Sequence, residues 1–312
     1  MSASTPSEQG LPALDVVIAT RNRPQLLAEA LAAVLDQDYP GLITVHVVFD
    51  QSEPDPSIAA AAAGRAERRV LVHRNERTPG LAGARNSGIL AGTAPLVAFC
   101  DDDDVWLPQK ATRQIAELLD SGADTVVSGI VVEYDGERTE RVPRIEDLEI
   151  SALVRNRVME AHPSTVTVRR EALLERIGLV DEEIPGSYGE DFDWIIRAAQ
   201  NGPLALAAAP LVRVRWGGSQ FSQNWDVIVR AIDYGLVKHQ VFHADRRALA
   251  RLQGRRAFAL AALHRRGALR AAAQTVRTAP SERRAYLAAA VALRLVSAER
   301  LLDLAHRRGH GI

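Results

Sequence analysis

The stretch that decides the fold is Leu14-Asp-Val-Val-Ile-Ala-Thr20, which leads through three polar residues to Pro24. Its apolar, β-branched run is typical of a strand that is buried on both faces. Pro24 then stands where the first residue of a helix would, because its fixed φ suits that position and its missing N–H is not needed there. Apolar residues follow at helical spacing from Leu26 to Leu35. This segment therefore predicts a strand that runs directly into a helix.

Further apolar runs repeat the strand pattern, at residues 43–49, 70–73 and 96–100. Residues 84–90 between them have helical periodicity. Strands that alternate with helices predict βαβ units, so we expect an α/β fold with a Rossmann-like, mostly parallel central sheet. In such a sheet ligands bind beyond the carboxyl ends of the strands. Thr20, Asp50 and Asp101 follow three such ends and are expected to line one crevice.

The rest of the chain is first mixed and then helical. Residues 124–134 and 165–168 have β patterns, and residues 191–200 have the pattern of an amphipathic helix. From Trp225 onward the pattern is helical, which predicts a helical C-terminal extension. The expected regions are a flexible tail over 1–11, an α/β domain over 12–240 and a basic helical region over 241–312.

Composition excludes several classes of protein. Cys100 is the single cysteine, which rules out a disulfide within one chain and a cysteine-based zinc site. No run reaches the roughly 18 to 20 apolar residues of a membrane-spanning helix. The first residues lack the basic and apolar parts of a signal peptide. We therefore expect a cytoplasmic protein, with peripheral attachment to the inner face of the membrane left open.

Four consecutive aspartates, Asp101 to Asp104, directly follow the predicted strand 96–100. Like charges repel and raise each other's pKa, so a cation is expected to compensate them. Mg²⁺ and Mn²⁺ prefer carboxylate oxygens together with the phosphates of a nucleotide. A solvated acidic turn is the alternative. The place of the cluster at a strand end, where ligands bind, favours the metal site.

Two other segments contain candidate functional residues. Glu190 and Asp191 open the predicted helix at 191–200, where acids are either caps and dipole partners or a general base. Asp191 is the preferred base and Glu190 the alternative. The glycine-rich segment from Thr78 to Gly88 carries Arg85 and Asn86, which can reach phosphate or ribose oxygens. A plain helix cap explains that segment equally well.

Taken in order, these motifs resemble those of the family 2 glycosyltransferases of GT-A fold. The resemblance covers residues 14 to about 225. Each motif is common alone, but their shared order and spacing are specific. The matching segments are Val17-Ile-Ala-Thr20-Arg21-Asn22-Arg23, Phe49-Asp50-Gln51-Ser52, Gly80-Leu-Ala-Gly-Ala-Arg85-Asn86-Ser-Gly88, Asp101-Asp-Asp-Asp104 with Trp106-Leu-Pro108, and Gly189-Glu190-Asp191.

The resemblance implies a divalent-metal-dependent enzyme that transfers a sugar, with inversion, to the hydroxyl of an unidentified acceptor. Its cofactor is expected to be Mg²⁺ or Mn²⁺, and its donor a UDP-, dTDP- or GDP-linked sugar. The residues that it implies for binding of the nucleotide-sugar are Thr20, Arg21, Arg23, Asp50, Arg85, Asn86, Asp101 and Asp102. Asp103 is implied as the best metal ligand, together with Asp101 and Asp104. Asp191, with Glu190 as the alternative, is implied as the base.

The chain departs from the family pattern at two places. Phe49-Asp50 offers one acid where many relatives have two. The segment Trp216-Gly-Gly-Ser219 lacks a histidine that many relatives use to hold metal or diphosphate. Arg213, Arg215 or Trp216 could make those contacts instead. His162 precedes a short predicted strand where relatives build acceptor contacts, and either such a contact or a purely structural role is open to it.

Two other functions stay open as alternatives. One is a catalytically silent module that binds nucleotide-sugars and recruits a partner, although the intact acidic motifs argue against it. The other is nucleotidyl transfer to a sugar phosphate, which usually requires a glycine-rich loop directly after the first strand. That loop is absent from Thr20-Arg-Asn-Arg-Pro24.

The C-terminal region has a charge unlike that of the rest of the chain. Residues 245–312 contain 15 Lys and Arg against 4 Asp and Glu, which leaves 23 against 35 elsewhere. A solvated helical face, a surface for anionic lipid and a docking face for an acidic acceptor or partner are the interpretations. Nucleic acid is not expected, because aromatic content is 5% and no stacking pattern accompanies the arginines. A homodimer is also left open.

Overall fold

The computed structural model describes residues 10–216 and 224–306. The chain forms two compact units, and it passes between them more than once. The first unit comprises residues 1–149, 158–182 and 194–217, and the second comprises residues 150–157, 183–193 and 218–312. Two short segments from the middle of the chain therefore belong with the C-terminal helices.

The described strands of the first unit form one mixed sheet, in the order β3-β2-β1-β4-β8-β6-β9-β5, with β7 paired to β6. Strands β1 to β4 are parallel to one another, and β8 is antiparallel to both of its neighbours, β4 and β6. The bounds are β1 Leu14–Thr20, β2 Ile43–Phe49, β3 Arg68–Arg74, β4 Leu96–Phe99, β5 Val105–Trp106, β6 Thr125–Tyr134, β7 Glu137–Arg141, β8 Thr167–Arg169 and β9 Leu204–Arg215.

The parallel half of the sheet confirms the predicted α/β class. Leu14 pairs with Ile43 on one side and with Leu96 on the other, and Thr20 pairs with Phe49. The carboxyl ends of β1, β2 and β4 therefore lie at the same edge of the sheet. The residues that follow these ends are the ones that the sequence assigns to ligand binding.

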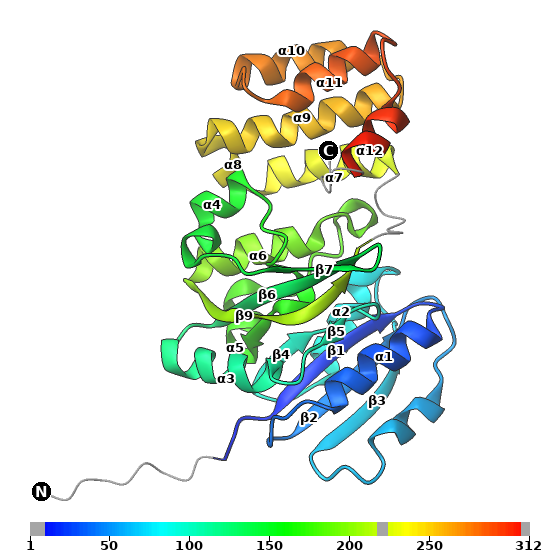
Figure 1. The fold of residues 1–312 in the computed structure, drawn as a ribbon, viewed down its shortest axis with the longest axis vertical. Coiled ribbons are helices and arrows are strands. Elements are labelled where there is room, and N and C mark those ends of the chain that lie inside the picture. The colour runs from blue at the N-terminus through cyan, green and yellow to red at the C-terminus, as the bar shows by residue number, and fades with distance from the viewer. Residues whose placement is uncertain (1–9, 217–223, 307–312) are drawn as a thin grey trace, which may run out of the picture. The chain divides into compact units, whose positions relative to one another are not determined.

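Helices cover both faces of this sheet. Alternate residues of β1, namely Leu14, Val16 and Ile18, belong to one apolar core with the buried faces of α1 and α3. On the other face, Gly88 of α2 lies so close to β1 that an added Cβ would be 2.5 Å from a methyl of Val17. Figure 1 shows α1 lying against the blue strands. The helix bounds are α1 Pro24–Leu35, α2 Leu81–Ala91, α3 Lys110–Ser121, α5 Arg170–Ala172 and α6 Glu190–Asn201.

Several elements differ from the sequence-based expectation. Strand β8 begins two residues later than predicted, because residues 163–165 form a 3₁₀ turn. Strand β9 was not predicted, since Leu204-Ala-Leu-Ala-Ala-Ala-Pro210 combines good helix formers with a proline. The sheet accommodates Pro210 opposite Gly129, where the pairing between β6 and β9 shifts its register. Proline donates no hydrogen bond to a ladder, so it is tolerated at such an irregularity.

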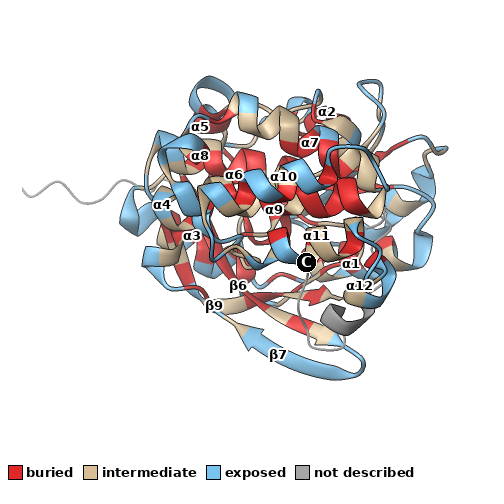
Figure 2. Cartoon of the chain, turned by 90° about the horizontal axis from the view of Figure 1, so that it is seen from above, coloured by how far each residue is buried: buried red, intermediate tan, exposed pale blue. Residues whose placement is uncertain are grey.

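The second unit is helical from Trp225 onward, as the sequence predicts. Its core contains many fully buried alanines, among them Ala257, Ala259, Ala261 and Ala288. The burial colours in Figure 2 distinguish the buried and exposed faces of these helices. Among the described residues, none of the helices has both the length and the apolar character that a membrane crossing requires. The bounds are α4 Ile150–Arg155, α7 Trp225–Lys238, α8 Val241–Ala244, α9 Arg246–Ala262, α10 Ala268–Thr278, α11 Arg283–Ala292 and α12 Ala298–His306.

Candidate functional site

The ends of the three parallel strands are tied together by hydrogen bonds. The Thr20 hydroxyl, at the end of β1, donates to Oδ2 of Asp102 at 2.8 Å. The backbone N–H of Asp50, after β2, donates to the carbonyl of Thr20 at 2.9 Å. The convergence expected from parallel pairing is therefore present, and it places Asp102 against the first strand.

Arg23 lies over the acidic loop that follows β4. Its Nη1 contacts Oδ1 of Asp102 at 3.1 Å and Oδ2 of Asp103 at 3.0 Å. Burial opposes the charge of Arg23, but Asp102 and Asp103 outweigh it and raise its pKa. Burial is also the main cause that raises the pKa of both carboxyls. Asp103 nevertheless keeps 42% of its side chain exposed.

Arg85 provides a second positive charge to the same loop. Its side chain is 4% exposed, and its Nη2 donates to Oδ1 of Asp101 at 2.5 Å. Arg85 comes from α2, in the glycine-rich segment that the sequence singles out. The protein thus compensates part of the aspartate charge with two arginines, in addition to the cation that the sequence predicts.

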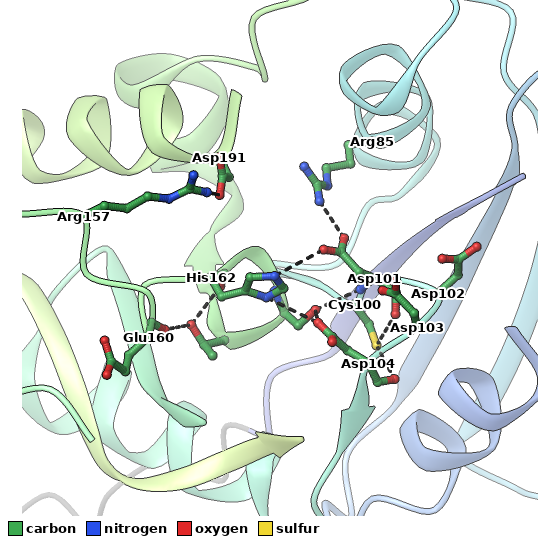
Figure 3. A network of polar contacts seen from close by, with 12 residues as sticks. Arg85, Cys100, Asp101, Asp102, Asp103, Asp104, Arg157, Glu160, His162 and Asp191 are labelled. Atoms are coloured by element: carbon green, nitrogen blue, oxygen red, sulfur yellow. Dashed lines mark hydrogen bonds and ion pairs between the residues drawn. The ribbon is translucent and has the colours of Figure 1, made fainter. Parts of the chain in front are cut away.

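Asp104, the last residue of the aspartate loop, contacts His162 (Figure 3). Oδ2 of Asp104 accepts a hydrogen bond from the Ser164 hydroxyl at 2.6 Å and lies 3.3 Å from Nδ1 of His162. Nε2 of His162 lies 3.7 Å from Oδ2 of Asp101. The Asp104 side chain is 2% exposed, and burial is the main cause that raises its pKa to about 7.

A divalent cation fits this arrangement chemically. Asp101, Asp104 and His162 can present ligand atoms that all lie within 4.8 Å of one another. Carboxylate oxygens suit Mg²⁺ and Mn²⁺, and an imidazole nitrogen is a ligand that transition-metal ions accept. Asp101 and Asp104 belong to the predicted ligand set. Asp103, predicted as the best ligand, instead contacts Arg23, while His162 joins the group without having been predicted as a ligand.

Asp50 anchors the start of the glycine-rich segment, at Gly80 directly before α2. Its Oδ1 accepts from Asn75 Nδ2 at 2.8 Å and from the Gly80 N–H at 3.0 Å, and its Oδ2 accepts from Gln51 Nε2 at 2.9 Å. Burial opposes ionisation, but these donors outweigh it and lower the pKa of Asp50, with Arg21 contributing a smaller electrostatic effect. Gly80 has a φ of 127°, a backbone conformation that favours glycine.

The side chain of Asn86 makes hydrogen bonds within the protein. Its Nδ2 donates to the carbonyl of Val180 at 2.8 Å and to Oε1 of Glu182 at 2.7 Å, and its Oδ1 accepts from the Val180 N–H at 2.9 Å. Its exposed fraction is 1%. In this structure the side chain of Asn86 thus holds residues 180–182 against α2. Its predicted contact with the nucleotide-sugar stays a prediction.

The two candidate bases open α6, as expected, and belong to the second unit. Asp191 accepts from Nη2 of Arg157 at 2.6 Å and keeps 16% of its side chain exposed, whereas Glu190 is 4% exposed. Figure 3 shows the pair of Arg157 and Asp191. Asp191 is the main cause that raises the pKa of Arg157. Arg157 had no sequence signal, because 34 positions separate it from Asp191.

The alternative contacts proposed near residue 216 have protein partners here. Arg213 pairs with Glu133 at 3.2 Å, and Arg215 pairs with Glu29. The guanidinium of Arg141 lies 4.8 Å from the ring centroid of Trp216. The residues that follow, Gly217 to Ser219, lie outside the described residues.

Comparison with known proteins finds similar sequences. The succinoglycan biosynthesis protein ExoO of Rhizobium meliloti (strain 1021) is 29% identical over 162 residues, which are 49% of this chain and 45% of that protein. The chain therefore spans less than half the length of this relative.

Two solved structures show the same GT-A-like fold. S. aureus TarS 1-349 in complex with UDP-GlcNAc has a TM-score of 0.61 at 18% identity, covering 95% of this chain and 92% of that one. The mannosyltransferase PcManGT from Pyrobaculum calidifontis, in complex with GDP-Man and Mn2+, has a TM-score of 0.57 at 22% identity, covering 95% and 84%. At these identities the likeness concerns the fold.

The comparison with protein families gives a direct match. The family model described as "Glycosyl transferase family 2" matches residues 15–176, which is half of the chain. The matched segment contains β1 to β4, the glycine-rich segment, the aspartate loop and His162. The chain therefore belongs to glycosyl transferase family 2.

Proposed function

We propose that this protein is a glycosyltransferase that moves a sugar from a nucleoside-diphosphate donor to an acceptor hydroxyl with inversion. The observation that carries this proposal is the loop Asp101–Asp104, which lies at the end of a parallel strand between Arg23, Arg85 and His162. Such a site can bind a metal–diphosphate group, because it combines carboxylates for the ion with guanidinium groups for phosphate oxygens.

The donor nucleotide is assigned to the ends of β1 and β2. Thr20 is the last residue of β1, Arg21 follows it, and Asp50 follows β2. A carboxylate offers about four acceptor positions, and three contacts to Asp50 come from Asn75, Gly80 and Gln51. Asp50 can therefore still accept an N–H from a nucleobase. TarS with UDP-GlcNAc and PcManGT with GDP-Man support a UDP- or GDP-linked sugar, and dTDP stays a third candidate.

Mg²⁺ or Mn²⁺ is the proposed cofactor, and its proposed ligands are Asp101 and Asp103. Asp103 is the more exposed of the two, so it is open to an ion that arrives with the donor. When bound, the ion would neutralise charge on the leaving diphosphate. The alternative ligand set is Asp101 with Asp104 and His162, which the spacing of their ligand atoms supports.

The proposed general base is Asp191. The acceptor oxygen attacks the anomeric carbon as its proton passes to the Asp191 carboxylate, and the bond from that carbon to the diphosphate oxygen breaks. A single displacement of this kind inverts the anomeric centre and needs no enzyme nucleophile. Glu190 is the alternative base, but its 4% exposure makes it harder for an acceptor to reach.

The decisive experiment identifies the products formed from a panel of UDP-, GDP- and dTDP-sugars with Mn²⁺. We expect slow release of nucleoside diphosphate and free sugar without an acceptor, since water can replace the acceptor hydroxyl. When pyrophosphate is added, formation of a nucleoside triphosphate and a sugar 1-phosphate would instead indicate nucleotidyl transfer, run in reverse. Nucleotide-sugar binding without turnover, even with candidate acceptors, would indicate a silent binding module. The cytoplasmic location, the peripheral membrane contact and the homodimer stay predictions.

A further inference from the structure

Four arginines of the second unit lie close enough to affect one another. Arg251 and Arg255 lie one helical turn apart on α9, Arg284 lies on α11 and Arg157 follows α4. Burial is the main cause that lowers the pKa of Arg251 to about 10, and Arg284, Arg255 and Arg157 lower it further. Burial, Arg157 and Arg284 also lower the pKa of Arg255. These guanidinium groups therefore form one cluster, named here the arginine cluster.

The arginine cluster is only partly neutralised by acids. Arg157 pairs with Asp191 at 2.6 Å, and Arg284 pairs with Glu282 at 2.9 Å. Glu190 acts on Arg157, and Glu282 also acts on Arg251, but only as weaker electrostatic influences. Within the part of the chain that the structure describes, Arg251 and Arg255 have no carboxylate in salt-bridge contact. These two positive charges are the ones open to an external anion.

Neutral groups hold these two arginines in place. Nη2 of Arg251 donates to the carbonyl of Val154 at 3.2 Å, and its guanidinium lies 5.4 Å from the ring centroid of Phe192. The guanidinium of Arg255 lies 5.5 Å from the ring centroid of Tyr188. Aromatic faces orient a guanidinium without neutralising it. Both arginines are half-buried, so they are fixed in position yet still reachable by a ligand.

Two buried polar atoms, one in the arginine cluster and one beside it, lack a well-formed hydrogen bond. Nε of Arg251 and the hydroxyl of Tyr188 are buried, and neither makes a hydrogen bond of good geometry among the described residues, although the Tyr188 hydroxyl lies near enough to Arg255 to act on its pKa. An unmade hydrogen bond at a buried donor is costly, so such atoms are informative about function. Both groups are donors, and an oxyanion would offer them acceptors.

We propose that Arg251 and Arg255 bind a phosphate group of the acceptor, with Arg157, Arg284 and Tyr188 completing the site. The proposal rests on the proposed function, in which Asp191 takes a proton from the sugar acceptor. Arg157 contacts Asp191 directly, so the arginine cluster would bind the same acceptor molecule. Phosphate is favoured over carboxylate, since two guanidinium groups without acidic partners match a doubly charged anion with several acceptor oxygens. A soluble sugar phosphate and a lipid-linked phosphate share this chemistry.

The test compares Arg251→Gln/Arg255→Gln with the control Arg247→Gln/Arg283→Gln. The control removes the same charge from arginines that are exposed on α9 and α11. Methyl phosphate is titrated by calorimetry at constant ionic strength, with acetate as the second probe. We expect the wild type and the control to bind methyl phosphate, and the Arg251/Arg255 variant to bind it at least about tenfold more weakly. Acetate should bind more weakly than methyl phosphate to the wild type.

Three outcomes would overturn the proposal. Equal methyl phosphate binding by both variants would remove Arg251 and Arg255 from the site, and preferred binding of acetate would make it a carboxylate site. A lower melting temperature of the Arg251/Arg255 variant without phosphate would assign both residues to stability. Relief of repulsion predicts an unchanged or higher value.

Two further measurements separate the inference from the proposed function. The Arg251/Arg255 variant should retain the affinity of the wild type for nucleoside diphosphate with Mn²⁺. Loss of that affinity would place the arginine cluster in the donor site and overturn the inference. If the wild type itself neither binds nor hydrolyses any nucleotide-sugar, the proposed function fails, whatever the result with methyl phosphate.

Phosphatidylcholine vesicles with and without polyprenyl phosphate distinguish the two sources of the phosphate group. Binding that requires the polyprenyl phosphate supports a lipid-linked acceptor, and binding of methyl phosphate alone supports a soluble one.

Discussion

The hydroxyl of Thr20 donates a 2.8 Å hydrogen bond to Asp102, although 82 positions separate the two residues in the chain. Thr20 is 4% exposed and Asp102 is 6% exposed, so the contact is shielded from water. A buried carboxylate loses its contacts with water, so each hydrogen bond that it accepts from the protein contributes to its stability. This contact therefore stabilises the folded protein and also fixes the acidic loop against the end of β1.

Replacing Thr20 by valine tests this dependence. Thr20→Val keeps the shape of the side chain but removes the donor to Asp102, so we expect a loss of about 1–3 kcal/mol in the free energy of unfolding. Urea unfolding at pH 7 measures it. The control Thr112→Val removes an exposed hydrogen bond to Asp38 of 3.0 Å and should cost at most about 0.5 kcal/mol. Equal effects of the two changes would show that the Thr20 contact is not buried in solution.

The ligands of the ion can be separated by three substitutions. Asp103→Asn should weaken the binding of Mn²⁺ in the presence of nucleoside diphosphate by at least about tenfold, because an anionic ligand is lost. Asp104→Asn and His162→Asn should change it by less than about threefold. Calorimetry gives the affinities. The reverse pattern would place the ion with Asp101, Asp104 and His162 and remove Asp103 from the ligand set.

Glu182 should make folding sensitive to acid. Its pKa falls from 4.5 to about 2, because burial, which acts in the opposite direction, is outweighed by hydrogen bonds from Asn86, Arg77 and Thr78. A lowered folded-state pKa contributes stability that is complete above the unfolded pKa and is lost as pH falls from about 4.5 to about 2. The shift corresponds to at most about 3 kcal/mol.

Glu182→Gln measures this contribution. The variant should be less stable than the wild type at pH 7, and the difference should shrink between pH 5 and pH 3 in urea unfolding. Glu175→Gln is the control, because Glu175 is exposed in the same unit and should show no such trend. A difference between wild type and Glu182→Gln that stays constant over this range would contradict the lowered pKa.

The parallel half of the fold could be predicted from local patterns. Strands β1 and β2 have the bounds that the sequence indicates, since short runs rich in β-branched residues, bounded by polar residues, have few alternative structures. Strand β9 could not be predicted, because its alanines favour a helix and Pro210 argues against a strand. Only pairing with β6, with its register shift opposite Pro210, makes this segment a strand.

For the site too, only the residues next to the parallel strands could be predicted from the sequence. The aspartate loop and Arg85 follow or precede strands that the sequence identifies, so their meeting follows from the sheet. His162 and Ser164 reach Asp104 because β8 pairs antiparallel with β4, aligning Leu96 with Arg169. That antiparallel pairing leaves no periodic signal in the sequence. Arg157 likewise meets Asp191 only through tertiary structure.

The assignment of Asp191 as base can be tested apart from donor binding. Asp191→Asn removes the proton acceptor but keeps the size of the side chain, so we expect unchanged affinity for the nucleotide-sugar. Transfer should fall by about 10²–10⁴-fold, the usual contribution of a general base. Glu190→Gln is the matched change at the neighbouring acid and should reduce transfer far less.

The salt bridge to Arg157 provides a second comparison for Asp191. Arg157→Gln leaves the carboxylate in place but removes its 2.6 Å ionic partner, so transfer should continue with an altered pH profile. A group that loses a nearby positive charge becomes easier to protonate, so the acid limb of the kcat profile should move to higher pH. If Asp191→Asn retained transfer and Glu190→Gln lost it, Glu190 would be the base and not Asp191. The carboxylate of Glu190 at the start of α6 would then be the one that accepts the proton.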